Sequence, residues 1–192
     1  MDISNNQTMR IILGMTGASG VVYGLRLLNV LQRTDHKIHV VMSSAWHTVA
    51  RQELGRQYAP PRPSHSTIIH HPDDFTAVIA SGSATFHSMV VAPCSGSSLG
   101  CIAAGVNQHL IHRAAEVQLK ERRQLILLIR ESPLSLIHLQ NMERITLAGG
   151  IIQTASPHFY TAPQTADDLV DSVVARTLDL IGVEHEIGKR WE

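Results

Sequence analysis

The sequence predicts an α/β protein in which one parallel sheet is covered by helices on both faces. The chain of 192 residues is long enough for one substantial hydrophobic core and too short for two ordinary domains. Short apolar segments alternate with segments of helical periodicity along its length. The apolar segments are apolar throughout, which is typical of strands buried on both faces. We therefore expect a single layered domain.

Strands are predicted where a short apolar run is bounded by polar or turn-forming residues. The first run ends at a glycine-rich turn, and the run at 124–129 is continuously apolar. Residues 55–66 hold three prolines and are predicted to form a surface loop. Residues 67–83 give no clear pattern. The predicted strands are 10–15, 38–42, 88–92, 124–129 and 150–153.

Helices are predicted from apolar residues at helical spacing and from the capping residues in front of them. Ser43 is a candidate N-cap for the second helix, and Thr165 opens the last one. A Ser/Gly-rich turn at 95–98 is expected to precede a short helix. The other predicted helices span about 21–31, 44–54, 108–123, 134–147 and 166–181.

Composition excludes several functions. Lys and Arg number 16 and Asp and Glu number 16. The chain therefore has no excess of positive charge with which to bind a nucleic acid. No apolar run approaches the roughly 18 residues that span a bilayer, and we expect no membrane partner. Residues 1–9 are predicted to be a polar tail without signal-peptide features, and 10–192 the single domain. Two cysteines fit a reducing compartment, and we expect the cytoplasm.

A glycine-rich turn at 14–20 follows the first predicted strand and leads into a helix. Free backbone N–H groups and the helix dipole at such a point favour an anion or the edge of a flavin. A nicotinamide-dependent dehydrogenase usually has an acidic residue after its second strand, where this chain has Ser43 and Ser44. The alternative is that the glycines serve only close helix packing.

The Ser-Gly-Ser-Ser turn at 95–98 follows another predicted strand. Its hydroxyls and consecutive N–H groups suit an anion nest, and they also suit an ordinary helix cap. Carboxyl ends of parallel strands meet at one edge of a sheet, where ligands bind. The two turns together therefore indicate a phosphate-bearing ligand, and FMN fits such a crevice.

Charged residues occur at two further places. Arg113 and Lys120 are seven residues apart in one predicted helix and share a face. Arg130 and Glu131 directly follow a strand, so they lie at the rim of the sheet, and we expect the Glu131 carboxylate to be partly buried and charge-paired. The alternatives are a solvated helix face paired with Glu116 and a rim salt bridge between Arg130 and Glu131.

The acidic run Asp167-Asp168-Leu169-Val170-Asp171 imitates the magnesium motif of all-helical prenyl diphosphate enzymes. We interpret these acids as helix-start residues favoured by the dipole. His109 and His112 have helical spacing suited to a shared metal, but no third ligand stands near them in the sequence. We predict no metal site.

Six stretches together resemble the UbiX-type flavin prenyltransferases, once described as aromatic acid decarboxylases. The resemblance covers residues 10–191 and follows the family's order and spacing. The stretches are Met-Thr-Gly-Ala-Ser-Gly at 15–20, Ala-Pro-Cys-Ser at 92–95, Arg-Ala-Ala-Glu-Val at 113–117, Leu-Lys-Glu-Arg-Arg at 119–123, Arg-Glu-Ser-Pro-Leu at 130–134 and Phe-Tyr at 159–160.

The resemblance implies a three-layer Rossmann-like (flavodoxin-like) fold with a central parallel sheet. It also implies a symmetric homo-oligomer, usually a dodecamer, with active sites between subunits. The implied catalytic residues are Ser19, Lys120 and Glu131. The implied FMN contacts are Gly17, Ala18, Ser19, Ser43, Ser95, Gly96, Ser97, Ser98 and Arg130. The implied substrate-binding residues are Glu53, Arg113, Lys120, Tyr160 and Arg176.

The implied reaction joins a dimethylallyl group from dimethylallyl monophosphate to N5 and C6 of reduced FMN. The product would serve a UbiD-type decarboxylase. Loss of phosphate from an allylic carbon needs Arg, Lys and hydroxyl donors around the leaving group. Glu131 or the released phosphate is the candidate acceptor for the C6 proton. We expect a metal-independent transferase.

Two other functions are alternatives. A flavin-dependent cysteine decarboxylase would carry a Pro-x-Met-Asn-x-x-Met-Trp-like motif, which is absent here. A non-catalytic flavin-binding protein would not need Lys120, Glu131 and Arg176. The chain departs from the family pattern at Gly96-Ser97, at Phe75 and at 153–155, and these departures bear on the shape of the pocket.

Overall fold

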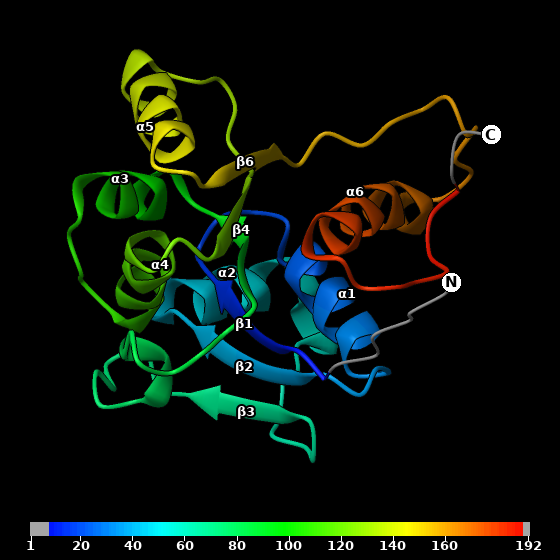
Figure 1. Cartoon of the computed structure of the whole chain (residues 1–192). Coiled ribbons are helices and arrows are strands. Elements are labelled where there is room, and N and C mark those ends of the chain that lie inside the picture. The colour runs from blue at the N-terminus through cyan, green and yellow to red at the C-terminus, as the bar shows by residue number, and fades with distance from the viewer. Residues whose placement is uncertain (1–7, 190–192) are drawn as a thin grey trace, which may run out of the picture.

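The computed structural model describes residues 8–189, and its core is one parallel sheet. The strands are β1 (Arg10–Met15), β2 (Lys37–Met42), β3 (Thr67–His70), β4 (Ser88–Cys94), β5 (Gln124–Ile129) and β6 (Ile151–Thr154). They are arranged in the order β3-β2-β1-β4-β5-β6 (Figure 1). This is the Rossmann order and not the flavodoxin order. The predicted parallel α/β fold is confirmed.

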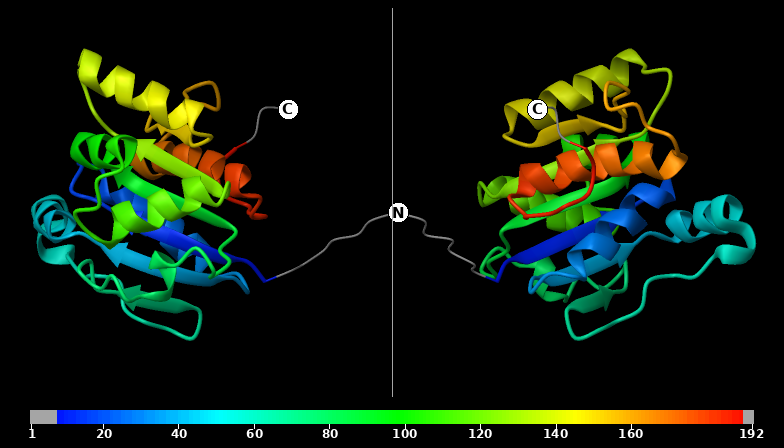
Figure 2. Two further views of the ribbon diagram at one scale, coloured as in Figure 1. Left: turned by 60° about the vertical axis from the view of Figure 1, so that its left-hand side comes forward. Right: turned by 90° about the vertical axis from the view of Figure 1, so that its right-hand side faces the viewer.

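Helices cover both faces of the sheet. They are α1 (Val21–Leu31), α2 (Ser44–Leu54), α3 (Gly96–Ala104), α4 (Leu110–Lys120), α5 (Leu136–Leu147) and α6 (Ala166–Ile181), with short 3₁₀ turns η1 (Gly55–Gln57) and η2 (Val78–Ala80). α1 and α6 lie on one side of the sheet and α3, α4 and α5 on the other (Figure 1). Figure 2 shows the sheet twisting between these layers. None of the helices within residues 8–189 has the length and hydropathy to cross a bilayer.

The strands divide their side chains between two cores, because successive residues of a strand point to opposite faces. In β1, Ile11 and Leu13 join the core under α1, α2 and α6, whereas Ile12 joins the core under α3, α4 and α5. β4 and β5 alternate in the same way. Burial on both faces explains why these strands have solid apolar sequences.

Two segments differ from expectation. The turn predicted at 95–98 is wrong in its extent, because α3 already begins at Gly96. The Ser95 side chain accepts a hydrogen bond from the Ser98 N–H at 3.2 Å, and the Ser95 carbonyl accepts one from Leu99. The unassigned stretch 67–83 contains β3, an edge strand of four residues paired only with β2.

A buried histidine of β2 contacts a partly buried histidine of β3. The His39 Nδ1 lies 2.8 Å from the His70 Nε2, and His39 is only 4% exposed. Desolvation, with His70 and Arg10 nearby, lowers the pKa of His39 to about 4. Desolvation and the adjacent His109 lower the pKa of His112 to about 4 as well.

These histidines should make the fold acid-sensitive. In the unfolded chain a histidine takes up a proton near pH 6.5, whereas in the folded chain His39 and His112 resist protonation down to about pH 4. Stability should therefore fall as pH falls from about 6.5 toward 4, by roughly 1 kcal/mol per pH unit for each histidine. Urea unfolding at fixed protein concentration and several pH values measures this slope. A His39→Gln variant should show a shallower slope, and an unchanged slope would contradict the assignment.

Candidate active site

The carboxyl ends of β1, β2, β4 and β5 meet at one end of the parallel sheet, where α/β proteins of this kind bind ligands in a crevice. The turn after β1 is tied to the turn after β4, because Thr16 Oγ1 donates to the Pro93 carbonyl and accepts from the Ser95 N–H, both at 2.8 Å. Arg130 Nε donates to the Ser19 carbonyl at 3.3 Å. The structure thus gathers most of the expected FMN contacts at this edge, from the turns at 17–19, at Ser43 and at 95–98.

Gly17 has a packing role within this edge. A Cβ at Gly17 would lie 2.5 Å from the Ala45 Cβ, so only glycine lets the turn approach the start of α2. The interpretation of the glycines as packing residues therefore holds at this position.

The start of α1 already holds an anion, which is the carboxylate of Glu53. Glu53 Oε1 accepts the Gly20 N–H at 2.8 Å, and Oε2 accepts the Val21 N–H at 3.0 Å. The prediction of free N–H groups for a ligand at this helix start is therefore wrong for these two groups. A carboxylate of the chain itself accepts hydrogen bonds from both N–H groups and balances the positive end of the helix dipole.

Glu131 lies at the rim of the crevice but differs from expectation. The residue is exposed, and its Oε1 accepts the Ser132 N–H at 3.1 Å. Within residues 8–189 it forms no ion pair, so the predicted burial and charge pairing are wrong, as is a rim salt bridge with Arg130. The cause is local, because the chain leaves β5 at Ile129 and runs over the surface until α5 begins. A Cβ at Gly96 would lie 3.5 Å from Glu131 Oε2, so this carboxylate stands over the turn after β4.

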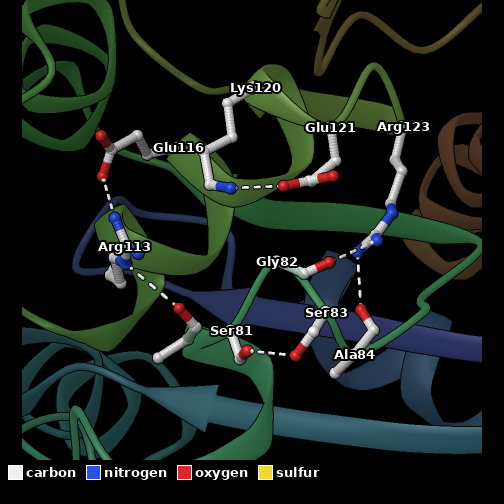
Figure 3. Close-up of polar contacts among 10 residues, drawn as sticks. Ser81, Gly82, Ser83, Ala84, Arg113, Glu116, Lys120, Glu121 and Arg123 are labelled. Carbon is white, nitrogen blue, oxygen red and sulfur yellow. Dashed lines mark hydrogen bonds and ion pairs between the residues drawn. The ribbon is translucent and has the colours of Figure 1, made fainter.

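Arg113 and Lys120 lie on α4 in a separate group of charges (Figure 3). Arg113 Nη1 pairs with Glu116 at 2.9 Å, as the solvated-face alternative proposed, and Arg113 Nε donates to the Ala80 carbonyl at 3.1 Å. Lys120 Nζ forms an ion pair with Glu121, and this hydrogen bond lowers the pKa of the Glu121 carboxyl. Both cations are partly exposed.

Within one chain, the charged residues of α4 lie far from the crevice. Lys120 precedes the first residue of β5, whereas Arg130 follows its last residue. A strand of six residues at roughly 3.3 Å each separates the two positions by about 20 Å. Lys120 Nζ instead lies beside Gly82, in the loop that leads into the amino end of β4.

Tyr160 and Arg176 belong to a third place, a cavity of about 740 Å³ between β6 and α6 that His158 and Lys189 also line. The rings of His158 and Tyr160 stack 4.1 Å apart. Gln153, one of the departures from the family pattern, ties the two elements together. Its Nε2 donates to the Val173 carbonyl at 3.1 Å, and its Oε1 accepts from Thr177 at 2.9 Å.

The fold and the crevice define a nucleotide-binding α/β protein of the Rossmann type. The carboxyl end of the sheet offers hydrogen-bonding groups to a ligand, because Ser95 is half-buried with a free lone pair and four guanidinium N–H groups of Arg130 have no partner in the part of the chain described. The chain matches the Flavoprotein family over residues 3–178. It is 44% identical to a flavin prenyltransferase UbiX of Aquifex aeolicus (strain VF5), across 95% of this chain and 98% of that protein.

Two solved structures are similar along almost the whole chain. One is the AnUbiX protein in complex with FMN and dimethylallyl pyrophosphate, with a TM-score of 0.89, 37% identity and coverage of 97% and 98% of the two chains. The other is a dodecameric FMN-dependent UbiX-like decarboxylase from Escherichia coli O157:H7, with a TM-score of 0.86, 40% identity and coverage of 96% and 99%. The chain belongs to the Flavoprotein family and, within it, to the UbiX flavin prenyltransferases.

Proposed function

We propose that this protein joins a dimethylallyl group from dimethylallyl monophosphate to N5 and C6 of reduced FMN. One observation carries the proposal beyond family membership. Glu131 stands at the rim of the crevice that Ser19, Ser95 and Arg130 line, so a proton acceptor lies beside the expected flavin contacts. Reduced FMN, as the acceptor substrate, supplies the nucleophilic ring.

The residues of the crevice have distinct proposed roles. The turns at 17–19 and 95–98, with Ser43, hold and orient the flavin. Arg130, which donates to the Ser19 carbonyl, offers its other guanidinium N–H groups to the flavin. Glu131, exposed and without an ion pair within residues 8–189, takes up the C6 proton.

The phosphate-binding residues are proposed to come together only in a homo-oligomer. Lys120 and Arg130 lie at opposite edges of the sheet of one chain, so a neighbouring copy must supply Arg113 and Lys120. α5 offers a surface for such contact, since Leu136 is 69% exposed and Ile137 is 68% exposed. The dodecameric E. coli structure supports this assembly.

The product is proposed to serve a UbiD-type decarboxylase, which would receive the prenylated flavin. We place the reaction in the cytoplasm, because Cys94 and Cys101 are both free thiols and fit a reducing compartment.

Mass spectrometry tests the reaction directly. The protein is incubated anaerobically with reduced FMN and dimethylallyl monophosphate, and the molecular mass of the extracted flavin is measured. We expect a mass gain of one dimethylallyl unit, with reactions lacking the donor as the control. Unmodified flavin released from a tight complex would instead indicate a flavin-binding protein, and the diphosphate run in parallel identifies the preferred donor.

We expect the reaction to be insensitive to chelation of divalent metal. Acidic residues at the start of α6 already make structural contacts. Asp168 Oδ2 accepts the N–H groups of Gln164 and Thr165 at 2.8 and 3.0 Å. Asp171 pairs with Arg26 at 2.6 Å. Excess EDTA should leave the initial rate unchanged. A rate that collapses with EDTA and returns with magnesium would show that Asp167, Asp168 and Asp171 bind metal.

A further inference from the structure

A buried histidine of α4 contacts the turn that is expected to bind the flavin. His112 is 2% exposed, and its Nε2 lies 3.2 Å from Ser98 Oγ. Its Nδ1 accepts the Gln108 N–H at 3.3 Å. The sequence suggested only a metal-ligand role for this residue, and neither of its ring nitrogens is free for one.

These contacts fix the tautomer of His112. A backbone N–H can only donate, so Nδ1 must carry a lone pair and the proton of the neutral ring is on Nε2. His112 therefore donates to Ser98 Oγ. Desolvation and the ring of His109, whose centroid is 3.8 Å away, lower the pKa of His112 to about 4 and keep the ring neutral at pH 7.

The donated proton determines how the two serine hydroxyls are arranged. Ser98 Oγ accepts from His112 and, at 3.2 Å, from Ser95 Oγ, which occupies both of its lone pairs. Ser95 Oγ accepts the Ser98 N–H at 3.2 Å and has one lone pair left. Since its own hydrogen is used toward Ser98, the Ser95 hydroxyl can meet a further group only as an acceptor.

We propose that His112 is a positioning residue that holds the Ser95 hydroxyl as a hydrogen-bond acceptor toward the flavin. This inference rests on the proposed function and deepens it, because it specifies which part of the flavin meets the turn. An acceptor selects a donor, so the group of oxidised FMN against the Ser95 hydroxyl is the N3–H or a ribityl hydroxyl and not the phosphate.

Two kinds of measurement test the proposal. Nitrogen NMR of histidine-labelled protein distinguishes the two neutral tautomers and should show protonated Nε2 at His112 with or without FMN. FMN titration of variants then measures the contribution to binding. His112→Leu and Ser98→Ala should each raise the FMN Kd by about tenfold, the loss expected for a buried hydrogen bond. The double variant should be no weaker than the weaker single variant, because the three residues act in series.

Rescue and ligand analogues separate positioning from general stability. His112→Gln retains an N–H donor at the same reach and should bind FMN nearly as well as wild type. Among FMN analogues that each lack one donor, by N3-methylation or by removal of one ribityl hydroxyl, one should bind wild type about tenfold more weakly than FMN. The same analogue should lose nothing further in Ser95→Ala.

The outcomes are distinct. An FMN Kd unchanged in His112→Leu, with only a lower unfolding temperature, would overturn the positioning role, as would protonated Nδ1 in the NMR spectrum. Tight FMN binding without any prenylated product in wild type would instead overturn the proposed reaction and leave the His112 assignment intact.

Discussion

Replacing Glu131 with Gln should slow prenyl transfer by about 10²- to 10⁴-fold, the usual cost of losing a general base. The variant keeps the size of the side chain and its acceptance of the Ser132 N–H, and it removes only the basic oxygen. The FMN Kd should not change, because Glu131 is not among the expected flavin contacts. Single-turnover experiments with reduced FMN and dimethylallyl monophosphate measure both quantities.

The exposed Glu184, near the carboxyl terminus, provides a matched control, since Glu184→Gln makes the same chemical change away from the crevice. An unimpaired Glu131→Gln enzyme would mean that the released phosphate alone accepts the proton. Glu131 would then have no part in moving the proton.

Lys120→Ala should raise the KM for the prenyl phosphate at least tenfold while sparing FMN. A charge-assisted hydrogen bond to phosphate is worth about 1.5 to 3 kcal/mol, which corresponds to this loss. Lys37→Ala, at the exposed start of β2, is the control. An equal loss of FMN affinity would show that Lys120 contacts the flavin instead.

The separation of Lys120 from Glu131 allows a sharper form of this experiment. If each site takes Lys120 from one copy and Glu131 from another, mixed oligomers of Lys120→Ala and Glu131→Gln chains contain some sites with both native residues. With random mixing, half of the lysine positions and half of the glutamate positions are native, so about a quarter of the activity should return. Verified mixed oligomers that regain no activity would contradict a shared site.

Local patterns predicted those parts of the fold that are determined locally. β5 and α6 were predicted with the observed bounds, because one is a continuous apolar run and the other follows a capping threonine. β3 was missed because it is a short edge strand, with Ile68 47% exposed, and its sequence does not read as buried. The Rossmann order of the sheet depends on contacts between distant segments and could not be read from periodicity.

The candidate site shows the same division. The turns at 14–20 and 95–98 were found from their Gly- and Ser-rich sequences, and they were expected to lie together because parallel strands end on the same side of the sheet. Glu53 and its partner Gly20 are 33 residues apart, and no local pattern links them. The shared helix face of Arg113 and Lys120 was correct, but helical spacing does not show to which edge of the sheet that face belongs. The direction of the chain shows this, because a helix that leads into β5 must end beside the amino ends of the parallel strands.

The Glu53 carboxylate at the start of α1 also bears on where the electrons of the reaction come from. In dinucleotide-binding Rossmann proteins the pyrophosphate sits on the N–H groups of the first helix. Here a nicotinamide dinucleotide seated in that way would meet a negative charge and two N–H groups already bonded. The fold therefore offers no such seat for a hydride donor, and we expect the flavin to arrive already reduced by a separate oxidoreductase. Supply of reduced flavin, rather than catalysis alone, would then couple this enzyme to the redox state of the cell.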